Sequence, residues 1–114
     1  MTLQLGLSNH PKFDVTLDGF LEFACRLEAS HVELKVDCPV LLEALFQKSK
    51  VRSLRDTLES YNLKYILHAP SIDVNLASLN PQVGKASLKA VEASVHLAAE
   101  LNAKLIVSHA GRLS

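Results

Sequence analysis

The sequence predicts an α/β protein built on a parallel β-sheet. Short apolar segments suited to strands alternate with longer segments whose apolar residues recur at helical spacing. The order is strand, helix, strand, helix, strand, helix, strand, and each helical segment is long enough to cross back over a sheet. Apolar residues make up 48% of the 114 residues and charged residues 21%, which is typical of a folded chain. We therefore expect a single domain over residues 1–114.

Four segments are expected to form strands. Leucine alternates with polar or small residues near the N-terminus, and three further short segments that contain several apolar residues follow along the chain. Such short apolar runs are typical of parallel strands that are covered by crossover helices. The predicted strands are residues 2–8, 31–36, 64–68 and 104–109.

The first two connections are predicted to be helical. Apolar residues on one face mark the first helix, and Asp14 or Thr16 can cap its start. The second connection begins with a short helical piece over residues 37–50 that has no firm boundary, and continues as a cleaner helix over residues 51–62. The inward residues of the first helix are Leu17, Phe20, Leu21, Ala24 and Leu27.

The third connection is predicted to be the longest helix. Asn80 is a suitable cap and Pro81 suits the first helical position, so we expect the helix to run from there to about Leu101. Its charged stripe includes His96, which we assign to the solvated face. Its inward face is predicted to consist of Leu88, Val91, Val95 and Ala98.

Two architectures fit this order of elements: an open doubly wound sheet, or part of a (β/α)8 barrel. A whole barrel needs about 250 residues. On the barrel interpretation, the chain supplies about four strands and three main helices, which is the N-terminal half. The inner face of such a half-barrel and its two edge strands would be exposed, and exposed edges pair with other chains. We therefore expect a homo-oligomer formed through the exposed half-barrel face.

Charge and composition narrow the classes of partner. Twelve basic and twelve acidic residues cancel, so the chain carries no electrostatic footprint for nucleic acid or an anionic membrane. No apolar run approaches the roughly 20 residues of a membrane span, and the N-terminus lacks the features of a signal peptide. Cys25 and Cys38 are interpreted as reduced thiols of a cytoplasmic protein. Phosphate-binding glycine motifs and a GxSxG motif are absent from the sequence.

The candidate site follows from the ends of the strands. In parallel α/β folds, the functional loops lie at the carboxyl ends of the strands. His68 and His109 each end an apolar strand, and adjacent strands are about 4.8 Å apart. The two imidazoles are therefore predicted to reach one metal ion or one substrate, although a catalytic zinc site needs about three protein ligands. Glu33 lies inside an apolar strand, where a carboxylate is either functional or simply turned toward solvent, and is the candidate to help the pair.

Other polar residues lie in the predicted loops at the same edge. His10 follows the first strand, Asp73 and Asn75 follow the third, and Arg112 follows the fourth. We interpret these four as candidate substrate-binding residues. Asp73 and Asn75 are equally well explained as turn and cap residues. His31 begins a strand, at the opposite end of the sheet, and is assigned to structure.

Two stretches, "HAPSIDVNLASLNP" and "AAELNAKLIVSHAG", resemble the xylose-isomerase-like barrel superfamily. This superfamily includes sugar phosphate isomerases and epimerases and the endonuclease IV group of abasic-site nucleases. Members carry "HAPY…NLAS" after the third strand and "VVVHPG" in the next one, and "HVEL" at 31–34 is similar to their second strand. In this sequence Ser71 replaces a common aromatic residue, Asn102 a glycine and Ala110 a proline. The matching residues are His68, Ala69, Pro70, Asn75, Leu76, Ala77, Ser78, Ser87, Ala103, His109 and Gly111.

The resemblance implies a divalent-metal-dependent isomerase or epimerase that acts on a sugar or sugar phosphate. His68 and His109 would bind metal, such as zinc or manganese, or line the substrate pocket, with Glu33 as the catalytic base. The family's remaining ligands come from later strands, so the metal site is expected to be incomplete and these 114 residues inactive alone.

Two alternatives remain open. The first is an abasic-site nuclease of the endonuclease IV type, for which only Lys12, Lys35 and Arg112 provide basic residues on the expected loops. The second is an inactive half-barrel fragment that self-associates.

Overall fold

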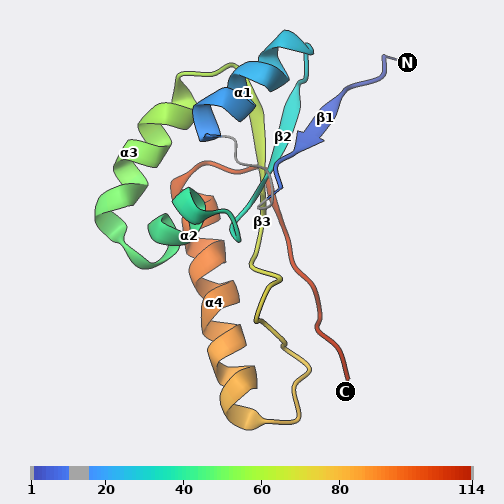
Figure 1. The fold of residues 1–114 in the computed structure, drawn as a ribbon, viewed down its shortest axis with the longest axis vertical. Coiled ribbons are helices and arrows are strands. Elements are labelled where there is room, and N and C mark those ends of the chain that lie inside the picture. The colour runs from blue at the N-terminus through green and yellow to red at the C-terminus, as the bar shows by residue number, and fades with distance from the viewer. Residues whose placement is uncertain (1, 11–15, 114) are drawn as a thin grey trace.

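The computed structural model describes residues 2–10 and 16–113. Within these ranges the chain alternates strands and helices, and the connection between the second and third strands holds two helices. Figure 1 shows all of the helices on one side of the strands. The elements are β1 (Gly6–Ser8), α1 (Leu17–Arg26), β2 (His31–Lys35), α2 (Pro39–Phe46), α3 (Lys48–Glu59), β3 (Lys64–His68), α4 (Pro81–Glu100) and β4 (Leu105–Val107).

The sheet distinguishes between the two predicted architectures. Its strands are all parallel and lie in the order β1-β2-β3-β4. A doubly wound sheet would place the first strand in the interior and helices on both faces. Sequential order with helices on one face is the arrangement of a (β/α)8 barrel, of which four strands are half. The prediction of a partial barrel is confirmed.

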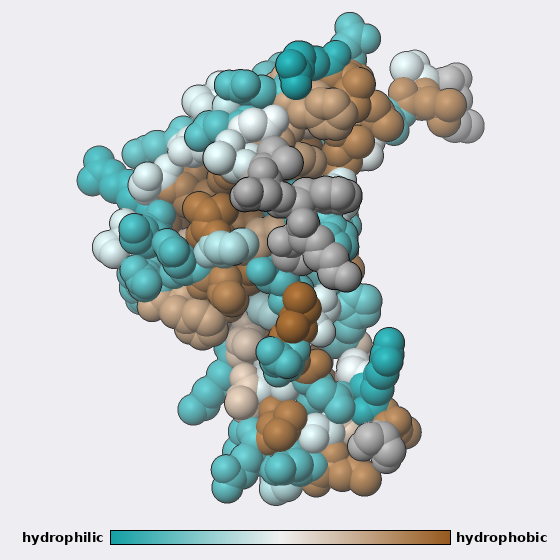
Figure 2. Space-filling model, in the orientation of Figure 1, coloured by the Kyte–Doolittle hydropathy of each residue, from teal (hydrophilic) through white to brown (hydrophobic). Residues whose placement is uncertain are grey.

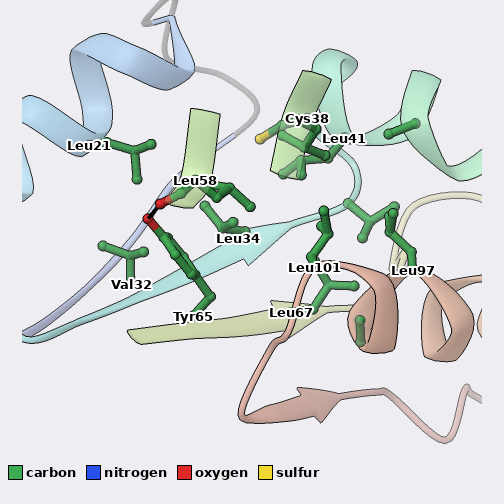
Figure 3. Packing of buried hydrophobic residues seen from close by; sticks show 14 of the residues in the cluster. Leu21, Val32, Leu34, Cys38, Leu41, Leu58, Tyr65, Leu67, Leu97 and Leu101 are labelled. Atoms are coloured by element: carbon green, nitrogen blue, oxygen red, sulfur yellow. Dashed lines mark hydrogen bonds between the residues drawn. The ribbon is translucent and has the colours of Figure 1, made fainter. Parts of the chain in front are cut away.

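The core lies between the sheet and the helices. Alternate residues of the strands point toward the helices, and Val32 and Leu34 of β2 are fully buried there. Figure 3 shows Leu97 of α4 and Leu101, which directly follows α4, beside Leu67 of β3. The other residues of each strand face the opposite side, which forms the inner face of the half-barrel. In register across the sheet, the inner-face residues are Gly6, Ser8, His31, Glu33, Lys35, Lys64, Ile66, His68, Leu105 and Val107.

The two edge strands are shorter than predicted. β1 begins at Gly6 rather than at residue 2, and Leu3 is 93% exposed. The reason is that its neighbour β2 begins only at His31, so the residues before Leu5 have no strand to pair with. β4 likewise covers Leu105–Val107 rather than 104–109.

The buried face of α4 differs from the prediction. Leu88 and Val95 are about half exposed, whereas Ser87 and Ser94 are buried. Each buried serine donates its hydroxyl to the carbonyl four residues earlier, at 2.8 Å in both cases. The hydroxyls are thus satisfied within the helix, and the small side chains allow α4 to pack closely on its neighbours.

The helix ends follow known capping rules. Thr16 Oγ1 accepts from the Gly19 amide at 3.1 Å and caps α1, as predicted, whereas Asp14 lies outside the described residues. The predicted short piece after β2 is the helix α2, which starts at Pro39. α3 begins earlier than predicted, at Lys48, and ends at Glu59.

Apolar surface is distributed unevenly over the molecule. In Figure 2 apolar side chains gather over the part formed by α1, α2 and α3, while the part around the start of α4 is mostly hydrophilic with separate apolar spots. None of the described helices is both long enough and apolar enough to cross a membrane.

Candidate functional site

His68 is held firmly at the carboxyl end of β3. Its carbonyl accepts from the Val36 amide at 2.9 Å, and the next amide, that of Ala69, donates to the Val107 carbonyl at 2.8 Å. These bonds fix the backbone between β2 and β4. The side chain is 7% exposed, and its Nδ1 lies 2.8 Å from the Ala69 carbonyl oxygen. Because a carbonyl only accepts, Nδ1 carries the proton and Nε2 presents a lone pair.

His109 meets that lone pair from the neighbouring segment. Its Nε2 lies 3.1 Å from Nε2 of His68, and the ring centroids are 4.9 Å apart. Two imidazoles on one tetrahedral zinc, each at about 2.05 Å, would hold their nitrogens about 3.3 Å apart. At this distance His109 Nε2 donates a hydrogen bond to the lone pair of His68 Nε2, and the same separation is close to that of two ligands of one metal ion. The Ala69 carbonyl on Nδ1 is the kind of second contact that orients metal-binding histidines.

Glu33 and Lys35 share the inner face with His68. Lys35 is the register partner of His68, and Glu33 stands one inner-face position deeper, beside Ile66. Two residues along a strand span about 6.6 Å, so Glu33 lies beneath the histidine pair rather than beside it. Ser8 Oγ donates to Glu33 Oε1 at 3.2 Å, which holds the carboxylate toward β1.

The predicted help from Glu33 as a third ligand is not supported by the geometry. Within residues 2–10 and 16–113, no group of three His, Cys, Asp or Glu side chains is placed to hold a metal ion. The histidine pair thus offers two ligands, whereas a catalytic zinc ion usually has about three protein ligands.

Asn75 and Arg112 are brought together, through the Asn75 side chain and the Arg112 backbone. The Arg112 amide donates to Asn75 Oδ1 at 2.9 Å, and Asn75 Nδ2 donates to the Arg112 carbonyl at 2.9 Å. These contacts join the loop after β3 to the segment after β4. Their role as substrate-binding residues stays a prediction.

His10 and Asp73 lie against other parts of the molecule. His10 lines a cavity between the start of α1 and helices α2 and α3. Asp73 has φ 58° and lines a cavity of about 360 Å³ between α2 and α4. Neither cavity includes His68 or His109 in its lining. The structure therefore does not group these two residues with the histidine pair, and their proposed contact with substrate stays a prediction.

Two further polar residues, Asp37 and Asn9, join the loops near the site, and the sequence alone assigns them no role. The Asp37 carboxylate accepts from the amides of Ser71 and Ile72 and from Ser71 Oγ, at 2.9–3.2 Å. Asn9 Oδ1 accepts from the Lys35 amide at 2.7 Å. Both join neighbouring loops at the carboxyl edge. Their position directly after predicted strands was the available signal, but which groups they bond depends on the register between strands.

Cys38 is a buried thiol directly before α2. Burial and, secondarily, the negative charge of Asp37 raise its pKa above the ordinary value, while Lys35 acts in the opposite direction. Asn9 Nδ2 donates to its sulfur at 3.2 Å. The side chain is 8% exposed and belongs to the hydrophobic core, so Cys38 is placed as a packing residue.

Comparison with known proteins gives a family match over most of the chain. The model of the family described as xylose isomerase-like TIM barrel matches residues 6–114. Two uncharacterized proteins of Methanocaldococcus jannaschii match shorter stretches. MJ1614 is 45% identical over 53 residues, and MJ1311 is 30% identical over 61 residues. The matches cover 46% and 54% of this chain, but only 21% of each relative.

Solved structures share the fold. A D-tagatose 3-epimerase-like protein superposes with a TM-score of 0.78 at 21% identity, over 98% of this chain and 39% of that protein. The TTHB071 protein of Thermus thermophilus, from a crystal soaked with ZnCl2, gives 0.71 at 25% identity, over 99% and 41%. Endonuclease IV of the same organism gives 0.63 at 19% identity, over 93% and 39%. The chain thus spans about two fifths of these structures.

Proposed function

Because the chain belongs to the xylose isomerase-like TIM barrel family, we propose that it forms the N-terminal half of a metal-dependent sugar or sugar phosphate isomerase or epimerase. The observation that carries the proposal is the histidine pair. Two Nε2 atoms 3.1 Å apart, one with its tautomer set by a backbone carbonyl, form a preorganised half of a divalent metal site at the carboxyl edge of the sheet.

Five residues have distinct roles in this proposal: Ser8, Glu33, Lys35, His68 and His109. His68 and His109 would hold the metal, zinc or manganese, which would supply a positive charge that polarises neighbouring oxygens of the sugar. Glu33 acts as the base that removes a proton from the carbon next to the carbonyl, and the Ser8 hydroxyl holds its carboxylate. Lys35, level with His68, supplies positive charge for a phosphate or a developing oxyanion. Asn75 and Arg112 belong to the segments that follow β3 and β4, whereas His10 and Asp73 line other cavities, and contact of these four with substrate is a prediction.

Proton exchange with solvent tests the proposal. The described residues supply two metal ligands, so the assay uses a complete barrel that includes this chain. Incubated with Mn²⁺ or Zn²⁺ in D2O and a panel of ketoses and their phosphates, it is expected to incorporate deuterium next to the carbonyl. Glu33→Gln is expected to slow incorporation by about 10²- to 10⁴-fold, the usual contribution of a general base. Glu92→Gln, on the exposed side of α4, is the matched control. Exchange that is equally fast in Glu33→Gln would contradict the assignment.

The alternative function is metal-dependent cleavage of abasic DNA. The same histidine pair favours it, because zinc nucleases also use imidazole ligands. Of the basic residues predicted for the expected loops, Lys35 and Arg112 are among the described residues and Lys12 is outside them. Even with Lys12 included, three positive charges offer little for phosphate contacts, so the sugar proposal is preferred. Cleavage of an abasic duplex that stops on metal removal, without any sugar proton exchange, would reverse that preference.

A further inference from the structure

The segment that carries His109 is anchored on both sides. Before it, Val107 of β4 accepts from the Ala69 amide at 2.8 Å. After it, both main-chain polar groups of Arg112 bond to one side chain, since Asn75 Oδ1 accepts from the Arg112 amide and Asn75 Nδ2 donates to the Arg112 carbonyl. His109 therefore lies in a short segment whose two ends are fixed, at Val107 by β3 and at Arg112 by the Asn75 side chain.

Gly111 shows that this anchor is closely packed. Its φ is +96°, a conformation that other residues rarely adopt. A Cβ at this position would lie 2.7 Å from the Ala77 amide nitrogen and 2.9 Å from that of Leu76, and would overlap Asn75 Oδ1. Because only glycine permits this approach, the contact between the two segments depends on both Asn75 and Gly111.

Asn75 is itself held by the helical layer. Its backbone N–H donates to Ser87 Oγ at 2.8 Å. Ser87 is 3% exposed, and its hydroxyl donates in turn to the Val83 carbonyl at 2.8 Å. A continuous series of hydrogen bonds thus runs from the interior of α4 through Asn75 to the segment of His109.

The hydrogen-bonding capacity of the Asn75 side chain is nearly used up by the protein. An amide side chain offers two acceptor sites and two N–H donors. Both acceptor sites are taken, by the amides of Arg112 and Ala77, and one N–H is taken by the Arg112 carbonyl. A single N–H is left for a ligand, so the side chain is better suited to placing the neighbouring segment than to recognising a sugar.

We propose that Asn75 is a positioning residue that sets the distance between His109 and His68. When the side-chain amide of Asn75 is removed, residues 108–112 lose their anchor beyond β4, and the Nε2 atoms of His68 and His109 separate. The placement of the two rings can be measured in the metal-free chain. That this placement serves metal binding rests on the function proposed above.

Asn75→Ala is the direct test, and Asn9→Ala is its matched control. Asn9 also joins two loops through its side-chain oxygen and nitrogen, but its partners are the Lys35 amide and the Cys38 sulfur, away from β4. Two readouts need no metal: the nuclear Overhauser contact between the His68 and His109 rings, and hydrogen exchange at the Arg112 amide. In Asn75→Ala we expect the ring contact to disappear and exchange at Arg112 to speed up by at least about 10-fold. In Asn9→Ala both are expected to stay as in the wild type.

Metal titration completes the experiment. Loss of an outer contact of a ligand typically lowers metal affinity by about 10- to 100-fold, and we expect a loss in this range for Zn²⁺ in Asn75→Ala alone. An intact ring contact and a protected Arg112 amide in Asn75→Ala would overturn the inference. A different result separates the two proposals. If the wild type binds no Zn²⁺ but the ring contact is present in the wild type and absent in Asn75→Ala, the positioning role holds and the proposed metal function fails.

A second variant covers the case in which Asn75→Ala does not fold. Gly111→Ala keeps the Asn75 side chain but adds the Cβ that the packing excludes. It is expected to displace the segment and to abolish the same ring contact. A ring contact retained in Gly111→Ala would equally overturn the inference.

Discussion

Tyr65 links the sheet to the helical layer through one hydrogen bond. The residue is 8% exposed, and its hydroxyl donates to the Leu58 carbonyl near the end of α3 at 2.7 Å. Figure 3 shows the side chain extending from β3 toward Leu58. Burial raises the pKa of this phenol from 10.0 to about 12. The neutral, hydrogen-bonded form is therefore favoured in the folded protein.

Tyr65→Phe is expected to destabilise the fold and to change its alkaline behaviour. Loss of the hydrogen bond costs about 1 kcal/mol of unfolding free energy at neutral pH. The raised pKa means that Tyr65 stabilises the fold fully below pH 10, where it is neutral in both states. That stabilisation is lost as the pH rises toward 12, because the unfolded chain ionises first. Urea unfolding at pH 7 to 12 should show a wild-type advantage over Tyr65→Phe that shrinks above pH 10. A constant difference would contradict this account.

At the level of elements, α1 and α4 end in the same capping motif. The residues after the cap, Glu28 and Asn102, have φ of 56° and 57°, and both motifs show the paired backbone bonds that close a helix with a left-handed residue. Asn102 suits this conformation, which also explains why it stands where the family has glycine. Glutamate pays a steric cost there.

Glu28→Asn is expected to raise the unfolding free energy, because asparagine tolerates the left-handed conformation better. A gain of about 0.5–1 kcal/mol is the scale of such backbone effects. The reverse change at the equivalent position, Asn102→Glu, should lower stability by a similar amount. Thermal unfolding of the two variants measures this, and equal effects of the same sign would rule out the explanation.

The elements were largely predictable, and the failures have local causes. The order of strands and helices follows from apolar periodicity, and Thr16 and Asn80 were recognisable as caps. The predicted inward face of α4 is confirmed at Ala98 but wrong at Leu88 and Val95, because hydropathy ranks these two residues above serine. Serine hydroxyls that bond within their own helix can be buried at little cost, and small side chains permit closer packing. Periodicity alone does not contain that information.

At the level of the whole molecule, the described sheet has exposed edges and an open inner face. Leu105 of β4 is 52% exposed, and β1 and β4 each have a strand neighbour on one side only. Unpaired strand edges promote association with another chain. We propose that the isolated 114-residue chain forms homo-oligomers through the half-barrel face.

Light scattering across a range of concentrations tests this association. The wild-type chain is expected to have the mass of a dimer or larger species, compared with 12.5 kDa for the monomer. Leu105→Lys places a charge on the exposed edge strand and should shift the equilibrium toward monomer, whereas Val83→Lys, at the start of α4, should not. A wild-type monomer at all concentrations would refute the proposal.

The site was predictable in part for a topological reason. Parallel strands place their carboxyl ends together, so the approach of His68 to His109 could be expected from the sequence. The loop contacts could not, because partners such as Asn75 and Arg112 are 37 residues apart and meet only through the register of β3 and β4. The placement of His10 and Asp73 beside other cavities depends on helix packing in the same way.

Zn²⁺ titration of the chain and its histidine variants shows whether His68 and His109 bind one metal ion together. If His68 and His109 form one site, the wild type binds one ion per chain. Each single alanine variant should lose at least about 10-fold in affinity, and the double variant should be little worse than either, because partners in one site are not additive. His96→Ala, on the exposed side of α4, is the control and should bind like the wild type. An affinity that falls in His96→Ala and persists in the double variant would contradict the account.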